Sequence, residues 1–145
     1  MEPTLYDGDV LYLTRNVEPK YNDVIVIKGE KSGEWIIKRV IGLAGDEITI
    51  SEDGYVYRNG EKVEGDYEKY GPTDKNSWQN GRVLKENEIF YLGDNRSVSA
   101  DSRSSFSTCE RWQVVGVVSN LSIQMKSVSS FLFYNVKLPL KNIFS

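Results

Sequence analysis

The sequence predicts an all-β domain, mostly antiparallel, with a sandwich- or barrel-like arrangement and little helix. Two observations support this fold class. Short runs rich in β-branched and aromatic residues alternate apolar and polar side chains with period two, and Gly, Asp and Asn turns separate the runs. No comparable helical pattern competes with them. At 145 residues, the chain is long enough for one domain with a buried core.

The alternating stretches are expected to form strands. In chain order they cover residues 9–14, 23–29, 34–43, 46–50, 55–60, 88–93 and 112–123. Asp53-Gly54 directly precedes the 55–60 stretch, and Asn59-Gly60 ends it. Both dipeptides tolerate positive φ, so they predict hairpin turns at these two places.

Two segments depart from this pattern. Residues 64–86 are polar and rich in turn formers, and we expect a variable polar insertion or loop there. The β core would then consist of residues 1–63 and 87–145. The tail 130–145 is more apolar than a solvated terminus requires. This tail would pack on the core, bind a partner or lie on a membrane surface, and core packing is the favoured interpretation.

Composition excludes several functional classes. The net charge of −3 and the lack of a Lys/Arg block argue against nucleic acid as a partner. The chain has no histidine, which excludes a Ser-His-Asp hydrolase. Cys109 is the single cysteine, which excludes an internal disulfide and a multi-cysteine metal site, and without histidine no zinc site is expected. No cofactor is expected either.

No apolar run reaches the roughly 20 residues that span a bilayer, and no signal peptide opens the chain. The sequence begins inside what looks like a structured loop, which favours a fragment of a longer protein.

Lys38 lies within the apolar stretch WIIKRVIGL. Strand alternation places Ile36, Lys38 and Val40 on one face, and Ile37 and Arg39 on the other. If Lys38 faces aliphatic neighbours, lost hydration lowers its pKa, and its neutral amine becomes a general base near neutral pH. The alternative is a lysine on an edge strand with its ammonium in water and no catalytic role.

The stretch LGDNRSVSADSR, residues 92–103, follows an apolar strand and is dense in short polar and charged side chains. Ser97, Ser99 and Ser102 are candidates for hydrogen bonds to an amine or to a substrate backbone. Asp101 and Arg103 are expected to pair with each other or to lock neighbouring strands.

Three stretches, MEPTL (1–5), KRVIGLAGD (38–46) and GDNRSVSADSR (93–103), resemble in this order the motifs of the bacterial type I signal peptidases. These Ser/Lys proteases remove signal peptides at the outer face of the cytoplasmic membrane. The resemblance implies the signal-peptidase fold and an endopeptidase that cuts after small residues, typically Ala-x-Ala. Ala44 and Phe106 depart from the family pattern, which usually has proline and glycine there.

The resemblance also implies roles for individual residues. Lys38 would be the general base, and Ser99 would orient its amine. The family nucleophile is a serine directly before Met1, which this sequence does not contain, so the chain as given is expected to be inactive. The residues expected to bind substrate are Met1, Leu5, Ile36 and Ile37. The residues expected to support the site are Gly93, Asp94, Asn95, Arg96, Asp101, Ser102 and Arg103.

The implied partners are signal peptides of secreted preproteins. An N-terminal anchor would attach the protein to the cell membrane, with the catalytic domain on the extracytoplasmic side. The alternative is a noncatalytic signal-peptidase-like protein of Gram-positive bacteria, which acts in pilus assembly by binding extended peptides or pilin subunits. Retention of Lys38 in an aliphatic strand favours the protease. Cys109, Phe106 and the apolar tail receive no functional role.

Overall fold

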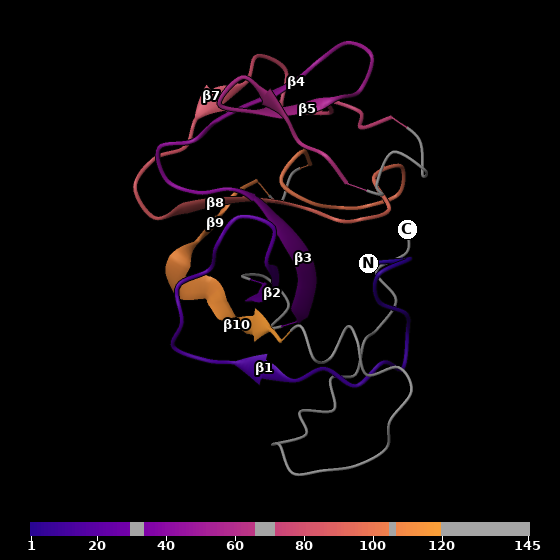
Figure 1. The fold of residues 1–145 in the computed structure, drawn as a ribbon, viewed down its shortest axis with the longest axis vertical. Helices are drawn as coiled ribbons and strands as arrows, with labels where there is room; N and C mark the ends of the chain where they lie inside the picture. Colours follow the sequence, from indigo (N-terminus) through magenta and orange to yellow (C-terminus); the bar gives the residue numbers. More distant parts are fainter. Residues whose placement is uncertain (30–33, 66–71, 105–106, 120–145) are drawn as a thin grey trace.

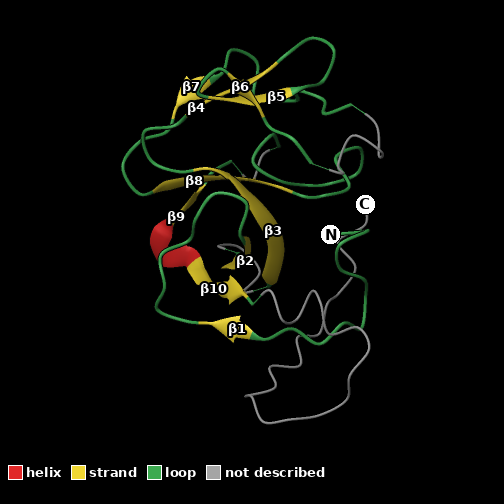
Figure 2. Ribbon diagram, viewed as in Figure 1, coloured by secondary structure: helices red, strands yellow, loops and turns green. Residues whose placement is uncertain are grey.

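The structure is a computed structural model, and it describes residues 1–29, 34–65, 72–104 and 107–119. Within these residues the fold consists of two antiparallel β-sheets and one short 3₁₀ helix, η2 (Arg111–Gln113) (Figures 1 and 2). The predicted class, mostly antiparallel β with little helix, is confirmed. No helix in the described part of the chain is long and apolar enough to cross a membrane.

The larger sheet has six strands and contains β2 and β3 at its centre. Its order is β1 (Leu13–Thr14), β10 (Val114–Val118), β2 (Val24–Lys28), β3 (Trp35–Gly42), β8 (Glu88–Leu92) and β9 (Cys109–Glu110). The smaller sheet has the order β6 (Glu61–Lys62), β5 (Val56–Arg58), β4 (Glu47–Ile50) and β7 (Arg82–Val83). Figure 1 shows the smaller sheet stacked on the β8 side of the larger one.

Alternation along β2 and β3 gives the larger sheet an apolar core on each face. Val26 and Ile37 pack in one cluster, and Ile27 and Val40 pack in another. This is the two-faced pattern that the sequence predicts for the strand around Lys38. Each fully buried aliphatic side chain contributes about 1.5–3 kcal/mol, so both faces stabilise the position of β3.

The strands β3 and β8 also connect the two sheets. Ile41, Phe90 and Leu92 belong to a third apolar cluster that contains Ile48 of the smaller sheet. A Cβ on Gly42 would lie 2.6 Å from the Ile48 Cδ1 atom, so this end of β3 needs a glycine to approach β4.

The two predicted hairpins are present. β4 and β5 pair through a turn in which Gly54 has a φ of +84°, and β5 and β6 pair through Asn59 and Gly60, with φ values of +54° and +79°. Two consecutive residues with positive φ are typical of a type I′ turn.

The described part of the polar segment 64–86 contributes to the smaller sheet. Arg82–Val83 forms β7, which pairs with β4, and Trp78 and Leu84 are buried in the apolar cluster between the sheets. The polar composition of the segment did not predict these contacts. The division into a β core and a variable insertion stays a prediction. Phe106 and the tail 130–145 lie outside the described residues.

Candidate active site

Lys38 lies in the middle of β3, between β2 and the end of β8. It is in register with Ile25 of β2, and its neighbour Arg39 is in register with Leu92 of β8. Gly93, directly after Leu92, therefore lies beside Lys38. A Cβ at Gly93 would stand 3.4 Å from the Lys38 Nζ and 2.6 Å from the Ser99 Cβ, and it would overlap the Ser99 hydroxyl. A glycine at this position makes room for the two side chains to meet.

The Lys38 amine donates a hydrogen bond to the Ser99 Oγ over 3.0 Å. The pKa of Lys38 is lowered from its ordinary value, mainly because the amine is buried. The nearby charges act in both directions, because Asp101 and Asp94 raise this pKa and Arg103 lowers it. The alternative of a lysine fully in water is wrong for this residue.

The loop that carries Ser99 is built around a buried ion pair between Asp101 and Arg103. The Arg103 Nε and Nη2 atoms donate to the Asp101 carboxylate over 2.8 and 2.9 Å, and the Arg103 and Asp101 side chains are 1% and 0% exposed. Asp101 also accepts from the Gly93 N–H at 3.1 Å. Ser102 ties the loop back to β8, since its Oγ accepts from the Tyr91 N–H at 3.0 Å.

The first half of the loop forms a turn closed by hydrogen bonds. The Ser99 N–H donates to the Asn95 carbonyl at 3.1 Å, and the Arg96 Nε donates to the Gly93 carbonyl at 3.1 Å. The Ser97 hydroxyl, by contrast, lies on the exposed side of the turn and donates to the Asn95 Oδ1 at 3.0 Å. Of the three candidate serines, only Ser99 forms a hydrogen bond to the Lys38 amine in the described residues.

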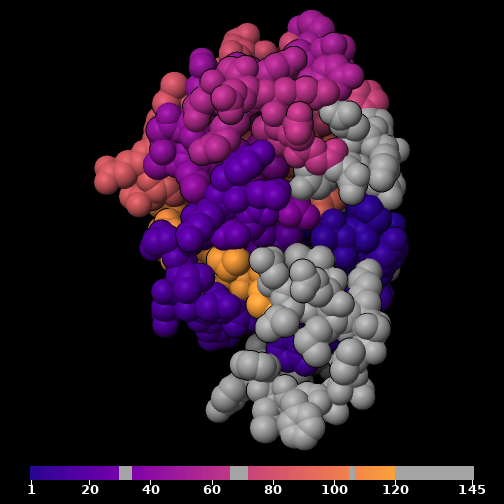
Figure 3. All heavy atoms as spheres, in the orientation of Figure 1, coloured from indigo at the N-terminus to yellow at the C-terminus, as the bar shows by residue number. Residues whose placement is uncertain are grey.

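The N-terminal segment is fixed to the same region through Asp94. The Asp94 carboxylate accepts from the Arg39 Nε and Nη2 over 2.9 and 2.8 Å, and it also accepts from the Thr4 hydroxyl. The Thr4 and Leu5 N–H groups both donate to the Met1 carbonyl, so residues 1–5 form a tight turn. Figure 3 shows this N-terminal segment, in indigo, at the molecular surface.

The charge of Lys38 acts on the Met1 amino group. Burial lowers the pKa of this amino group, and the positive charge of Lys38 lowers it further. Because Asp94 is bonded both to Arg39 of β3 and to Thr4, the structure holds the first residues next to the strand that carries Lys38.

The four residues expected to bind substrate do not share one face of the sheet. Met1, Leu5 and Ile37 pack in the same apolar cluster. Ile36 packs against the cluster on the opposite face, with Ile25 and Val40. The structure therefore brings three of the four together.

Sequence reasoning missed two groups of contacts. Thr4 lies in the MEPTL stretch, so the motif pointed to this segment. Its hydrogen bond to Asp94 spans 90 positions, however, and no local sequence pattern reveals it. Thr73 and Ser77, in the polar segment, contact the two loop arginines, and nothing in their surroundings in the sequence indicated this.

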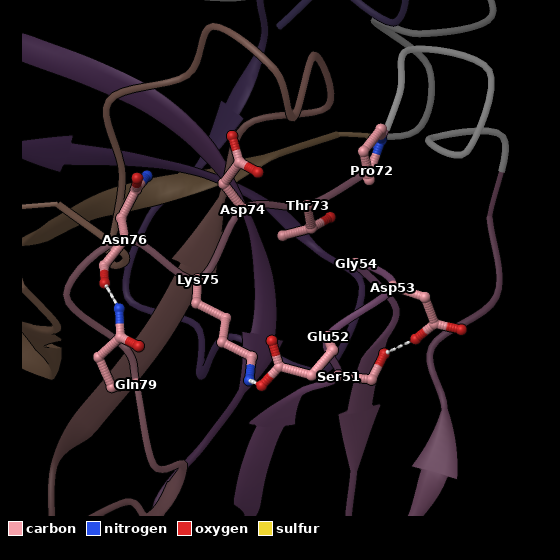
Figure 4. A pocket seen from close by; sticks show the side chains of 10 residues that line it. All are labelled: Ser51, Glu52, Asp53, Gly54, Pro72, Thr73, Asp74, Lys75, Asn76 and Gln79. Atoms are coloured by element: carbon pink, nitrogen blue, oxygen red, sulfur yellow. Dashed lines mark hydrogen bonds and ion pairs between the residues drawn. The ribbon is translucent and has the colours of Figure 1, made fainter.

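A polar pocket lies elsewhere, where the β4–β5 turn meets the segment after residue 71 (Figure 4). Lys75 and Glu52 form an ion pair across it. Its lining does not include Lys38 or Ser99. Among the described residues, no three His, Cys, Asp or Glu side chains are grouped to hold a metal ion.

Comparison with known proteins places the chain in a family of serine peptidases. Residues 1–123 match the family model described as signal peptidase, peptidase S26. The chain therefore belongs to the signal peptidase family, peptidase S26.

Several similar relatives come from Gram-positive bacteria. The chain is 34% identical over 127 residues to a signal peptidase I of Bacillus licheniformis, covering 80% of this chain and 68% of the relative. It is 33% identical over 140 residues to signal peptidase IB of Staphylococcus aureus strain COL, covering 82% and 71%. For signal peptidase I T of Bacillus subtilis strain 168 the identity is 34%, with 80% of this chain and 65% of the relative covered. The chain thus spans about two thirds of the length of these curated relatives.

The fold also resembles a solved structure. The crystal structure of a signal peptidase I from Enterococcus faecalis V583 superposes with a TM-score of 0.57 at 27% identity, covering 71% of this chain and 98% of that one. The antiparallel sheets described above therefore form the signal-peptidase fold.

Proposed function

We propose that the chain is the catalytic domain of a type I signal peptidase, an endopeptidase that removes N-terminal signal peptides after small residues of the Ala-x-Ala type. The observation that carries this proposal is the contact between the Lys38 amine and the Ser99 hydroxyl, 3.0 Å apart, in surroundings that lower the pKa of Lys38. An amine with a lowered pKa is the group that a serine protease without histidine requires as its base.

In the proposed mechanism a neutral Lys38 acts as general base. One of its N–H groups donates to Ser99, which leaves the nitrogen lone pair free to accept the proton of a serine hydroxyl. That serine would precede Met1, as in the family pattern. It would attack the scissile carbonyl, and the peptide C–N bond then breaks as the Lys38 ammonium donates its proton to the leaving amine. The neutral Lys38 would next activate the water that hydrolyses the acyl-enzyme. The bonds of Asp94 to Arg39 and Thr4, which hold the first residues beside the strand of Lys38, support this arrangement.

Two elements of the site would complete the reaction. The backbone N–H of the nucleophilic serine, with a hydroxyl further upstream, would stabilise the oxyanion. Asp101 and Arg103 would support the loop that carries Ser99, and Asp94 would support the N-terminal turn. Without the serine, residues 1–145 would not cleave peptide.

For substrate binding we propose a shallow apolar surface at Met1, Leu5 and Ile37, which pack together in one cluster. Ile36 would contribute from the other face of β3. Small side chains before the cleavage site would fit there while the substrate backbone binds as an extended strand. The partners would be signal peptides of secreted preproteins, and an anchor outside residues 1–145 would hold the domain on the extracytoplasmic side of the cell membrane.

The test uses the protein extended at its N-terminus by the native residues, assayed on a peptide with an Ala-x-Ala site. We expect cleavage after the second alanine. Lys38→Ala should lower kcat by about 10²–10⁴-fold, which is the usual contribution of a general base. Lys28→Ala is the matched control, because Lys28 is an exposed lysine on the neighbouring strand, and it should keep the full rate.

Two outcomes would overturn the proposal. One is cleavage that does not depend on Lys38. The other is an extended protein that binds the peptide without cutting it, which would support the noncatalytic role in pilus assembly.

A further inference from the structure

The loop 93–103 carries Ser99, but it contains no strand of its own and depends on two buried arginines. Arg96 and Arg103 are 4% and 1% exposed. Arg103 donates to the Arg96 carbonyl at 2.7 Å and to the Ser99 carbonyl at 3.4 Å, so its guanidinium joins the two halves of the loop. The direction in which Ser99 points therefore depends on where these arginines are held.

The polar segment 72–78 contacts both arginines. The Arg96 Nη1 donates to the Thr73 Oγ1 at 3.4 Å, and the Arg103 Nη1 donates to the Asp74 carbonyl at 3.3 Å. In return, Ser77 donates twice to the Arg103 carbonyl, through its backbone N–H at 2.8 Å and through its hydroxyl. The Ser77 hydroxyl is also 3.3 Å from the Ser104 carbonyl. Thr73 and Ser77 thus reach the loop from opposite ends of one short segment.

The segment is itself anchored to both sheets. The Trp78 ring packs on Phe90 of β8 with 4.5 Å between centroids, and its Nε1 donates to the carbonyl of Ile48 in β4 at 3.1 Å. At the other end, the Thr73 N–H donates to the Gly54 carbonyl at 3.1 Å. Figure 4 shows Thr73 in the wall of the polar pocket, between the β4–β5 turn and Asp74.

We propose that Thr73 and Ser77 are positioning residues that hold the loop 93–103 so that the Ser99 hydroxyl stays in reach of the Lys38 amine. This proposal rests on the proposed peptidase function. It gives the polar segment a role in the reaction, although Thr73 and Ser77 contact neither Lys38 nor Ser99. Hydrogen bonds of Ser77 and Arg103 connect the smaller sheet to the Ser99 backbone.

The experiment compares Thr73→Val, Ser77→Ala and the double variant in the N-terminally extended protein. Thr73→Val removes the hydrogen bond from Arg96, and Ser77→Ala removes the hydroxyl contacts with the Arg103 and Ser104 carbonyls. For each single variant kcat should fall by about tenfold, with KM changed by less than twofold. A loop that moves would also admit water to Lys38. The acidic limb of the pH profile of kcat/KM should therefore shift to higher pH.

Two controls separate positioning from loss of folding. Thr49→Val makes the same chemical change in β4 of the smaller sheet and should keep the wild-type rate and pH profile. Thr73→Ser retains the hydroxyl that Arg96 contacts, so it should also keep the wild-type rate and pH profile. Thermal unfolding of each variant gives the folded fraction by which the rates are corrected.

The proposal is overturned if Thr73→Val and Ser77→Ala, corrected for folded fraction, keep the wild-type kcat and pH profile. It is also overturned if kcat falls while the pH profile stays unchanged. Failure of the peptidase assignment is a different result, because then the wild-type extended protein is inactive or Lys38→Ala retains activity.

Discussion

The Lys38 Nζ lies 3.0 Å from the Ser99 Oγ, although the two residues are 61 positions apart in the chain. One comes from the centre of the larger sheet and the other from a loop that leaves the neighbouring strand. Their contact requires that β3, β8 and the Asp101–Arg103 pair all be in place. Stability and chemistry are therefore coupled at this site.

Replacing Lys38 with methionine should stabilise the fold at neutral pH. The folded pKa of Lys38 is lowered from its ordinary 10.5, mainly by burial, so the folded state disfavours the ammonium. Between the lowered pKa and 10.5 the unfolded chain binds more protons, and wild-type stability rises with pH. The advantage of Lys38→Met should therefore shrink towards pH 10.5, as measured by urea unfolding at several pH values. Exposed Lys28→Met should change stability by less than about 0.5 kcal/mol throughout.

Gly93→Ala should disrupt the contact between Lys38 and Ser99. The added Cβ would lie 2.6 Å from the Ser99 Cβ, a distance at which one group must shift. We expect a loss of about 1–3 kcal/mol in unfolding free energy and of about 10²-fold in kcat of the extended protein. Adding Ser99→Gly should restore stability but not activity. A single variant as stable as the wild type would contradict this prediction.

The pair of Arg39 and Asp94 should be costly to break from one side. The side chains are 10% and 0% exposed, so Asp94→Leu alone leaves a buried guanidinium without its carboxylate. The expected loss is about 3–5 kcal/mol by denaturant unfolding. The double variant with Arg39→Met should cost clearly less than the sum of the two single changes. Glu52→Gln, at an ion pair in which Glu52 is 93% exposed, should cost at most about 1 kcal/mol.

Glu88 should make stability depend on pH in the acidic range. The hydrogen bonds from Arg82 are the main cause that lowers the pKa of Glu88 from 4.5 to about 2. The stabilisation is complete above pH 4.5 and is lost as the pH falls towards 2. Melting temperatures measured over this range should therefore converge for wild type and Glu88→Gln at the acidic end. A constant difference between the two proteins would show that the carboxylate charge is irrelevant.

Cys109 should resist alkylation in the folded protein. Burial raises the pKa of its thiol to about 12, so the reactive thiolate is scarce at pH values near 8. Because the chain has a single cysteine, mass spectrometry reports its modification directly. Iodoacetamide should label the protein fully after denaturation and very slowly before it. Equal labelling rates would place the thiol at the surface.

The strand pattern and the motifs predicted much of this structure. Period-two alternation predicted both the strand around Lys38 and its two apolar faces, because neighbouring side chains in a strand point in opposite directions. The same rule places Ile36 and Ile37 on opposite faces, so their joint assignment to substrate binding stays a prediction. The resemblance to a family pointed to Ser99, which propensity alone could not distinguish from Ser97.

Other features could not be read from local sequence. β7 has only two residues, too few for any periodicity, and the burial of Trp78 depends on strands about 30 positions earlier. The bond between Thr4 and Asp94 joins segments 90 positions apart. Such contacts arise from the tertiary arrangement of the sheets, whereas propensity and turn chemistry act over a few residues.

The buried pair of Asp101 and Arg103 acts on Lys38 almost as a dipole. The two charges shift the pKa of the lysine in opposite directions, and lost hydration is the largest effect on this pKa. Dissolved ions weaken the field of exposed net charges, but they do not return water to an amine enclosed by protein. The basicity of this nitrogen should therefore be nearly the same in dilute medium and in brine.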